Sequence, residues 1–316
     1  MELRSKDVYF SRIEWEDTAF RITYGRPVIP LIQSIQAIGL QNPPVLQETE
    51  GGRFRIAAGS RRLHALKRIG RESVSCKIAP VGTEGKSLFL FNFHENMDRG
   101  FNLVEQSWII KKLSVFLEER ELTRDYLPLL NLPAKKEIFK RFLAISEISP
   151  IYLPALLQGR LFPETIEMVI RDFPSTADLI LALFIFLHWG FQKQKEFLSD
   201  LREMGKRGLE KPGSFLYSEP IAQLMRQEIR TSQQKGEALR KYFRTCLFPF
   251  LTETEKAFQK KVSLLNLDQR TRLFPPPFFE GGKYGLEITF SNSQELIESM
   301  ERVNRALQEK KLEDLP

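Results

Sequence analysis

Two adjacent arginines follow a glycine and a serine in the stretch "AAGSRRLHALKRIG", residues 57–70. Glycine lets a ligand approach the backbone closely, Ser60 adds a hydroxyl, and Arg61 and Arg62 add forked, permanently charged donors that suit phosphate oxygens. If a strand ends at Gly59 and a helix follows, unpaired N–H groups and the positive end of the helix dipole meet there. These residues therefore suit a phosphate cradle, although the same short pattern also occurs at ordinary solvated helix starts.

A second polar segment, "HENMDRGFNLVEQ", stands directly before a long stretch of helical periodicity. In it Glu95, Asn96 and Arg99 can together hold a magnesium–phosphate group, because oxygen ligands suit Mg²⁺ and a guanidinium offsets phosphate charge. The Glu95 carboxylate can also position or deprotonate a water molecule. The simpler interpretation is a polar helix start, with Asn102 as N-cap and Glu105 as its partner. The two interpretations use different residues, so both can hold.

Composition and charge limit the class of protein. The chain has 316 residues, 42% of them hydrophobic and 28% charged, which is ordinary for a soluble globular protein of two or three domains. Its formal net charge is +7, and residues 51–77 contain eight lysines and arginines against one acid, Glu72. This local excess favours a polyanionic ligand such as phosphate or nucleic acid.

Cysteine usage and hydropathy indicate a reduced, cytoplasmic protein. Only Cys76 and Cys246 occur, and neither they nor the three histidines have the spacing of a zinc site. No run of eighteen apolar residues is present, and the first ten residues, "MELRSKDVYF", lack the apolar core of a signal peptide. We therefore expect no zinc site, no membrane association and no export.

The first hundred residues predict a compact α+β domain. Residues 31–38 have helical spacing and stop at a glycine, and "NPPVLQET" then predicts a short strand. A glycine pair leads into a second strand, "RFRIAA". Ser60 is the expected N-cap of a helix that ends at Gly70, and "SVSCKIAP" predicts a third strand. This order places the glycine–arginine segment between a strand and a helix.

The rest of the chain is predicted to be helical until its last quarter. Between residues 102 and 201 apolar residues recur at helical spacing, and prolines and glycines separate the helices. After about residue 252 a helix leads to "KYGLEITF", which alternates as a strand does. Asn292 and Glu295 form an expected capping box for a last amphipathic helix. Because one hairpin and one helix bury little alone, we expect this end to pair with a second copy.

The two polar segments, in this order, resemble those of the ParB family of plasmid and chromosome partition proteins. Members carry a GERR-type segment after a strand and an EN-x-QR segment before a helix, which here read "GSRRLHAL" and "ENMDRGFNLVEQS". Upstream, "LIQSIQAIGLQNPPVLQ" is similar to a helix of the family and the strand that follows it. The resemblance covers residues 25–115 and implies a ParB/sulfiredoxin-like α+β N-terminal domain.

The resemblance implies a nucleotide site that uses CTP with Mg²⁺. By residue match, the nucleotide-binding residues would be Gly59, Ser60, Arg61, Arg62, Asn96 and Arg99. Asn96 would also help to coordinate magnesium, and Glu95 would assist a slow hydrolysis of the triphosphate. The chain departs from the family pattern at Ser60, where glutamate is common, at Asp98, where glutamine is common, and at Gly100, where an acid is common.

More weakly, the remaining chain resembles the helical and C-terminal parts of ParB. This implies an all-helical, helix-turn-helix-like middle domain, and a small αββα-type C-terminal dimerisation element. Residues available for DNA phosphates are Lys135, Lys136, Lys140 and Arg141. Their helix lacks the Ser, Thr, Asn or Gln run that usually reads bases, so a solvated basic face is the alternative. The expected domains are 1–115 (nucleotide-binding), 116–204 (DNA-binding), 205–250 (linker and helices) and 251–316 (dimerisation).

As a function, the resemblance implies a nucleotide-regulated homodimeric clamp on DNA, associated with the nucleoid in the cytoplasm and with a partition ATPase as a further partner. Two other functions stay open. One is a small-molecule kinase or nucleotidase with Glu95 as acid or base. The other is an adaptor that has lost the nucleotide, as the departures at Ser60, Asp98 and Gly100 suggest. A sulfiredoxin is excluded, because it needs a reactive cysteine where this chain has Ser60.

Overall fold

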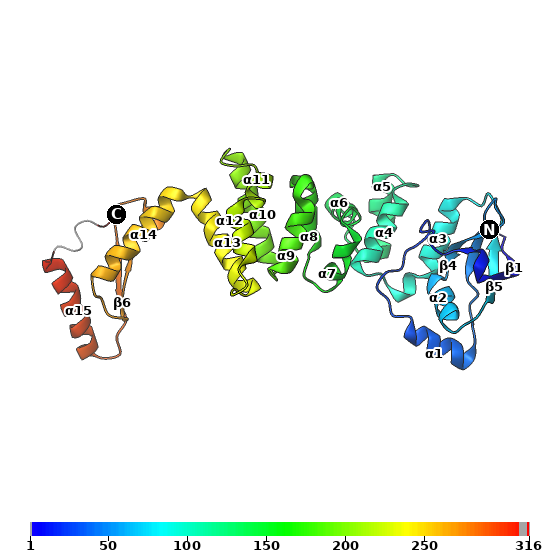
Figure 1. Ribbon diagram of the computed structural model, residues 1–316, viewed down its shortest axis with the longest axis horizontal. Helices are drawn as coiled ribbons and strands as arrows, with labels where there is room; N and C mark the ends of the chain where they lie inside the picture. The colour runs from blue at the N-terminus through cyan, green and yellow to red at the C-terminus, as the bar shows by residue number, and fades with distance from the viewer. Residues whose placement is uncertain (1, 310–314, 316) are drawn as a thin grey trace. The chain divides into compact units, whose positions relative to one another are not determined.

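The computed structural model describes residues 2–309 and residue 315 (Figure 1). The chain forms two compact units, Met1–Leu198 and Ser199–Pro316. This division does not test the finer four-part division, which stays a prediction. Within the described residues, no helix combines the length and the apolar character that crossing a membrane requires.

The first unit begins with a five-stranded sheet whose spatial order is β1-β5-β3-β4-β2. β3 and β4 form an antiparallel hairpin, and β5 lies parallel to β3 on its other side. β1 runs antiparallel to β5, and β2 pairs in parallel with β4. The strands are β1 (Arg4–Tyr9), β2 (Ile13–Glu14), β3 (Val45–Glu48), β4 (Phe54–Ala58) and β5 (Ser73–Ala79).

The predicted α+β pattern is confirmed, with two strands added. The added strands are β1 and β2, which the sequence does not predict. β1 is an edge strand in which only Val8 is buried, so it lacks the alternation that marks a half-buried strand. The helices of this part are α1 (Ile29–Ile38), α2 (Ser60–Arg68), α3 (Gly85–Glu95) and α4 (Leu103–Leu113).

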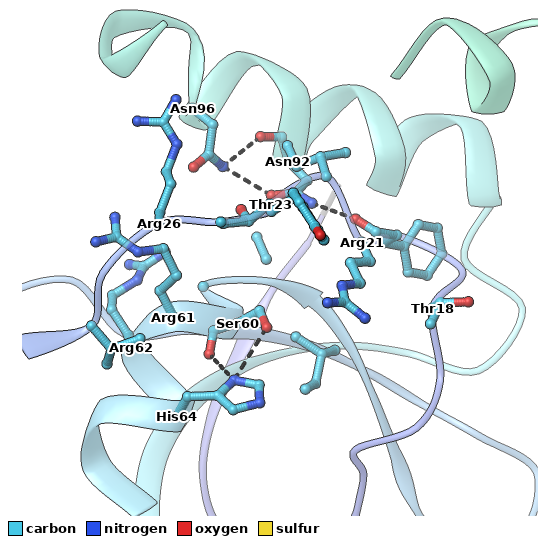
Figure 2. Close-up of a pocket in the computed structure, with 18 of the residues that line it drawn as sticks. Thr18, Arg21, Thr23, Arg26, Ser60, Arg61, Arg62, His64, Asn92 and Asn96 are labelled. Atoms are coloured by element: carbon cyan, nitrogen blue, oxygen red, sulfur yellow. Dashed lines mark hydrogen bonds between the residues drawn. The ribbon is translucent and has the colours of Figure 1, made fainter. Parts of the chain in front are cut away.

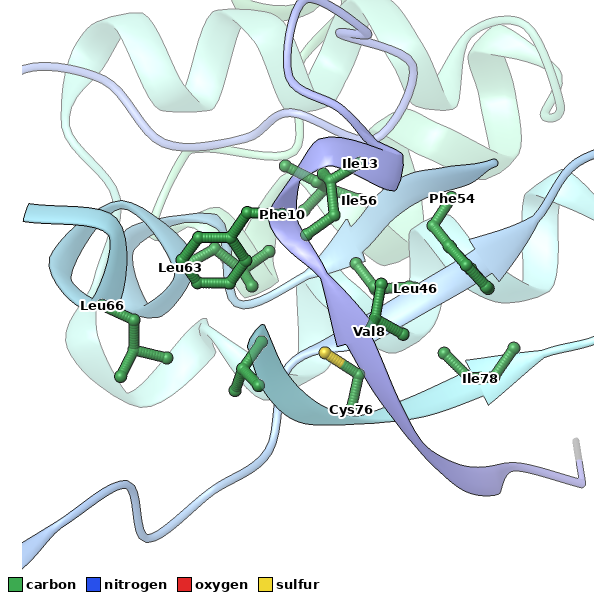
Figure 3. Packing of buried hydrophobic residues seen from close by; sticks show 11 residues of the cluster. Val8, Phe10, Ile13, Leu46, Phe54, Ile56, Leu63, Leu66, Cys76 and Ile78 are labelled. Carbon is green, nitrogen blue, oxygen red and sulfur yellow. The ribbon is translucent and has the colours of Figure 1, made fainter. Parts of the chain in front are cut away.

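Buried side chains of the strands and of α2 pack together in one hydrophobic core (Figure 3). Leu63 and Leu66 of α2 pack against inward-facing residues of the strands, among them Val8, Phe54 and Cys76. Burial raises the pKa of the Cys76 thiol to about 12, so this cysteine is an inert core residue. The packing fixes α2 on the sheet and therefore fixes where its N-terminus lies.

The N-terminus of α2 differs from the prediction in one residue. The N-cap is Gly59, and Ser60 is the first helical residue, so the expected N-cap role of Ser60 is wrong. Gly59 has φ 83°, a left-handed conformation that glycine adopts readily. This conformation turns the chain directly from β4 into the helix, without a side-chain cap.

The remainder of the first unit is helical, as predicted. Leu122–Tyr126 and Pro128–Leu130 form short helical turns, and Asn131 at φ 58° ends them before the next helix. The helices are α5 (Glu119–Glu121), α6 (Lys136–Ile145), α7 (Leu153–Leu157), α8 (Pro163–Asp172), α9 (Ala177–Phe186) and α10 (Phe191–Lys206). α6 packs against both α4 and α8, and α10 crosses the division between the two units.

The second unit ends in two helices that flank a two-stranded antiparallel sheet. Asn292 caps the last helix by accepting from the Glu295 N–H at 3.0 Å. The Glu295 carboxylate accepts from the Ser291 N–H at 2.8 Å, one residue before the expected donor. The elements are α11 (Pro212–Leu216), α12 (Glu219–Arg226), α13 (Ser232–Leu247), α14 (Pro249–Leu264), β6 (Thr271–Phe274), β7 (Gly285–Ile288) and α15 (Ser293–Gln308).

Candidate functional site

A pocket of about 1020 Å³ lies at the N-terminus of α2 (Figure 2). Its walls are the segment 15–28, the end of β4 with the first turns of α2, and the end of α3, and residues of the α7 region complete the lining. Five basic side chains line it against three acidic ones, so the pocket favours an anionic ligand. The basic residues are Arg21, Arg26, Arg61, Arg62 and Lys67, and the acidic ones are Glu16, Asp17 and Glu95.

The first turn of α2 supplies backbone donors to this pocket. The first hydrogen bond of the helix runs from the Leu63 N–H to the Gly59 carbonyl at 3.1 Å. The N–H groups of Ser60, Arg61 and Arg62 therefore have no partner inside the helix. No acidic residue occupies this turn. Free N–H groups and the positive end of the helix dipole together form an anion site.

Arg62 is held at both ends of its guanidinium. Its Nη1 donates to the Asn42 carbonyl at 2.8 Å, and its Nη2 lies 2.5 Å from Oε1 of Glu95. The guanidinium also lies against the Cα of Gly59, where a Cβ would come within 2.8 Å of Nη2. The left-handed backbone therefore favours glycine at position 59, and a Cβ there would force the end of the Arg62 side chain to shift.

Arg61 lies on the same turn and retains an unused donor. Its Nη2 donates to the Pro27 carbonyl at 2.7 Å. Its Nε is buried and has no hydrogen-bond partner within the described protein. Such a donor is costly unless something accepts from it, so a ligand oxygen in the pocket would satisfy it.

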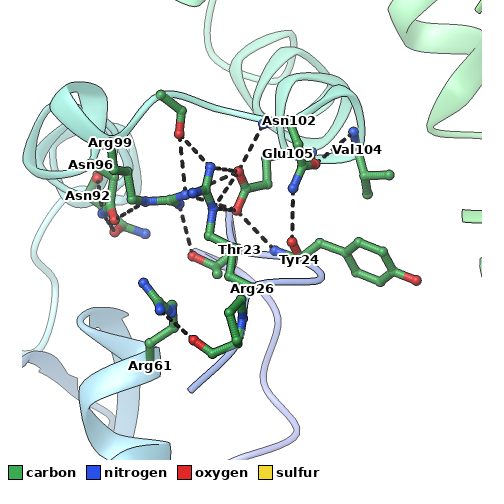
Figure 4. A network of polar contacts seen from close by, with 12 residues as sticks. Thr23, Tyr24, Arg26, Arg61, Asn92, Asn96, Arg99, Asn102, Val104 and Glu105 are labelled. Atoms are coloured by element: carbon green, nitrogen blue, oxygen red, sulfur yellow. Dashed lines mark hydrogen bonds and ion pairs between the residues drawn. The ribbon is translucent and has the colours of Figure 1, made fainter. Parts of the chain in front are cut away.

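Behind the pocket wall, the carboxylate of Glu105 joins three segments of the chain (Figure 4). It accepts from Arg26 at 2.8 Å, from Arg99 at 3.0 Å, and from the N–H groups of Tyr24 and Asn102. Burial opposes ionisation of this fully buried side chain, yet the bonds from Arg26 and Asn102 and the charge of Arg99 outweigh it and lower the pKa of Glu105. The expected capping box of Asn102 and Glu105 is confirmed.

Arg99 belongs to this network and is not among the residues that line the pocket. Its Nε donates to Oδ1 of Asn96 at 2.8 Å, and its Nη2 donates to Oγ1 of Thr23 at 3.1 Å. Burial is the main cause of a lowered pKa for Arg99.

Of the predicted site residues, six lie together at the pocket, namely Gly59, Ser60, Arg61, Arg62, Glu95 and Asn96. The phosphate-binding role of Arg99 stays a prediction.

The side chains present do not form a ready magnesium site. Oδ1 of Asn96, the expected ligand atom, accepts from Arg99, and its Nδ2 donates to Asn92. The Glu95 carboxylate is paired with Arg62. Among the described residues, no group of three or more His, Cys, Asp or Glu side chains is arranged for a metal ion. A guanidinium on the amide oxygen disfavours a cation there, so we derive no chemical step through magnesium.

The segment 18–26 was not identified as part of the site by the sequence, because it has neither periodicity nor a motif. It contributes Arg21 and Arg26 to the pocket. Lys112 of α4 holds this segment by donating to the carbonyls of Thr18 and Ala19, and burial lowers the pKa of Lys112 to about 8. The only signal for Arg26 was its position at the start of the stretch that resembles a known family.

The four basic residues predicted to bind DNA have different surroundings. Lys135 and Lys140 are exposed, and no ion pair of either is found in the described protein. Lys136 pairs with Glu119 at 2.7 Å. The Arg141 guanidinium lies 2.9 Å from Glu164 and 3.1 Å from a second carboxylate of α8. Arg141 therefore links α6 to α8, and its role in DNA binding stays a prediction like those of the other three.

The fold and the site define a class of protein: an α+β domain with a basic pocket at a strand-to-helix turn. Residues 26–92 match the family model described as the ParB N-terminal domain. The matched region includes the strand-to-helix turn and four of the five basic residues that line the pocket, which are Arg26, Arg61, Arg62 and Lys67. The match confirms, for this part of the chain, the resemblance to the ParB family that the sequence indicates.

Three solved structures are similar at low identity. The C-terminally truncated chromosome-partitioning protein ParB from Caulobacter crescentus complexed with CTP-gamma-S is 16% identical, with 56% of this chain and 98% of that chain covered and a TM-score of 0.27. The same protein complexed to the centromeric parS site is 15% identical, with 56% of this chain and 91% of that chain covered and a TM-score of 0.31. A Pnob8-like ParB-N domain is 13% identical, with 65% of this chain and 97% of that chain covered and a TM-score of 0.38. No curated protein matches the sequence significantly.

Proposed function

We propose that this protein is a ParB-like DNA-binding partition protein whose N-terminal pocket binds a nucleoside triphosphate, with CTP as the first candidate. The observation that carries the proposal is the convergence of Arg26, Arg61 and Arg62 with the free N–H groups of α2 in one pocket. This pocket lies in a domain of the ParB N-terminal family. A triphosphate would accept from the α2 turn and from the buried Nε of Arg61.

Isothermal titration with CTP and Mg²⁺ tests the nucleotide. We expect Arg61→Ala to weaken binding at least about tenfold, because a charge-assisted hydrogen bond to phosphate is lost. Arg68→Ala is the matched control, since Arg68 lies on the same helix, is exposed and does not line the pocket. ATP, GTP and UTP under the same conditions measure selectivity. Equal binding by the two variants and the wild type would contradict the proposal.

The proposal includes DNA binding by the helical part of the first unit. A short helical segment ending at residue 130 and α6 are joined by residues 131–135, as in a helix-turn-helix. Exposed Lys135 ends this turn and exposed Lys140 lies within α6, and both can reach phosphates. Nucleotide would regulate DNA binding if its affinity differs between two arrangements of a dimer. A partition ATPase is the further partner that such a role implies.

The C-terminal elements are proposed to form the homodimer. On α15, Ile297, Met300 and Leu307 are each about half exposed and recur at helical spacing. On the neighbouring strand segment, Leu286 and Phe290 are exposed to a similar extent. Large apolar side chains gathered on so small an element favour burial against a second copy. Sedimentation of the full chain over a range of concentrations tests this part of the proposal.

A further inference from the structure

We infer that Glu95 competes with phosphate for Arg62, so that a bound phosphate group must displace the Glu95 carboxylate and thereby release it. The inference rests on the proposed function, since it concerns the same pocket. It assigns to Glu95 a control over ligand affinity that is separate from any role in hydrolysis.

The geometry of Arg62 carries the first step. A guanidinium has five N–H donors, and Arg62 uses its two ends for the Asn42 carbonyl and for Glu95. Its face lies on the backbone of Gly59, so the side chain has little room to turn elsewhere. The side chain of Arg62 is 16% exposed and that of Glu95 is 29% exposed. A phosphate that approaches the α2 turn therefore meets an arginine whose Nη2 end is already paired.

The electrostatics carry the second step. Partly buried ion pairs are screened less by water and salt than exposed ones, so this pair is a real competitor for an anion. A triphosphate carries more negative charge than one carboxylate and can also accept from the N–H groups of the α2 turn, which Glu95 does not occupy. Exchange of Glu95 for phosphate is therefore favourable, but the apparent affinity is lowered by the pair that must be broken.

The exchange has a consequence for Glu95 itself. While it is paired with Arg62, the Glu95 carboxylate has one oxygen engaged by the guanidinium. Once phosphate takes Arg62, the carboxylate is free beside the phosphate, where it can hydrogen-bond a water molecule. Phosphate occupancy thus controls when Glu95 becomes available.

Asp98 provides a matched control. It lies three residues from Glu95, is exposed, does not line the pocket, and forms no ion pair found within the described residues. Asp98→Asn removes the same charge as Glu95→Gln from the same short segment. A general effect of net charge would act on both variants, whereas competition at Arg62 acts only through Glu95.

The test is a double-mutant cycle with inorganic tripolyphosphate and with CTP–Mg²⁺ as probes, read by isothermal titration at fixed salt. We expect Glu95→Gln to bind each probe about five- to tenfold more tightly than the wild type. Asp98→Asn should stay within about twofold, since exposed charges are screened. In an Arg62→Ala background the gain from Glu95→Gln should disappear. Thermal unfolding of each variant confirms that the fold is kept.

Three results overturn the inference: equal or weaker binding by Glu95→Gln, an equal gain by Asp98→Asn, or a gain that persists without Arg62, which would mean through-space repulsion. The proposed function fails separately. If the wild type binds tripolyphosphate but no nucleotide, the nucleotide proposal is lost and the cycle with tripolyphosphate still decides the inference. If neither the wild type nor Glu95→Gln binds any probe, both are overturned.

Discussion

Arg26 and Glu105 lie 79 residues apart in the sequence, yet two guanidinium nitrogens of Arg26 donate to the Glu105 carboxylate at 2.8 and 2.9 Å. Arg26 lines the pocket, whereas Glu105 is completely buried at the start of α4. The pair therefore fastens one wall of the pocket to the helical part of the first unit. It also fixes the direction of a basic side chain that would otherwise be free in solvent.

We predict that Glu105→Ala destabilises the protein by about 3–5 kcal/mol, because it leaves Arg26 and Arg99 without their buried counter-ion. The free energy of unfolding from urea titration measures this. Glu119→Ala is the control: its pair with Lys136 is exposed, so the loss should be below about 1 kcal/mol. Similar losses in the two variants would contradict the importance given to the Glu105 network.

The pKa of Glu105 predicts a pH dependence. Its pKa is lower in the folded protein than in the unfolded chain, so the stability that it contributes is fully present above about pH 4.5 and is lost as pH falls through the folded pKa. Glu105→Gln should therefore lose less stability on acidification than the wild type does. Urea midpoints measured at several pH values between 6 and about 3 check this, and parallel curves for the two proteins would refute it.

Gly59→Ala should weaken nucleotide binding about tenfold, because the new Cβ meets Arg62 at 2.8 Å and pushes its guanidinium away. Gly70→Ala is a close control. Gly70 has φ 84°, almost the same as Gly59, but a Cβ there meets nothing within 4 Å. Both variants should therefore share a backbone cost of about 1–2 kcal/mol, and only Gly59→Ala should change affinity. Titration and thermal unfolding of both variants separate the two effects.

On α6, Lys140 and Arg141 should respond differently to alanine substitution. Lys140→Ala should weaken DNA binding and reduce the slope of log affinity against log salt by about 1, because one phosphate contact is lost. Arg141→Ala should chiefly lower stability, by about 1 kcal/mol, since Arg141 pairs with Glu164 and Glu167. Fluorescence anisotropy on a DNA duplex at several salt concentrations measures the first effect. A slope unchanged by Lys140→Ala would remove this helix from the DNA contacts.

The exposed apolar residues of α15 predict the oligomeric state. Ile297→Glu and Met300→Glu should each shift the protein from dimer to monomer, because a charge would be buried at the interface between copies. Arg302→Glu, at an exposed position on the other side of the same helix, should leave the assembly unchanged. Analytical ultracentrifugation reads the outcome. A wild-type protein that is monomeric at all concentrations would contradict the proposed dimer.

Local signals in the sequence predicted much of the N-terminal domain. The hairpin, the strand β5 and the helix α2 follow from turn residues and from apolar periodicity, which depend only on neighbours along the chain. The capping box of Asn102 and Glu105 was read in the same way. β1 was missed because an edge strand buries too few residues to leave a pattern. The N-cap of α2 lies one residue before the predicted position. Gly59, in a left-handed conformation, is the N-cap, and Ser60 is already helical.

The amino-acid sequence by itself determined that a glycine–serine–arginine–arginine turn would begin a helix after a strand. That turn and the segment near Glu95 gave the resemblance to the ParB family, and the family match over residues 26–92 covers the turn. Only the tertiary structure decided which charges meet. It brought Arg26 to the pocket, placed Arg99 behind the wall on Glu105, and paired Arg62 with Glu95. Local periodicity carries no information on the Arg26–Glu105 and Arg62–Glu95 pairs, because their partners lie 79 and 33 residues apart and only the packing of the domain sets the distance between them.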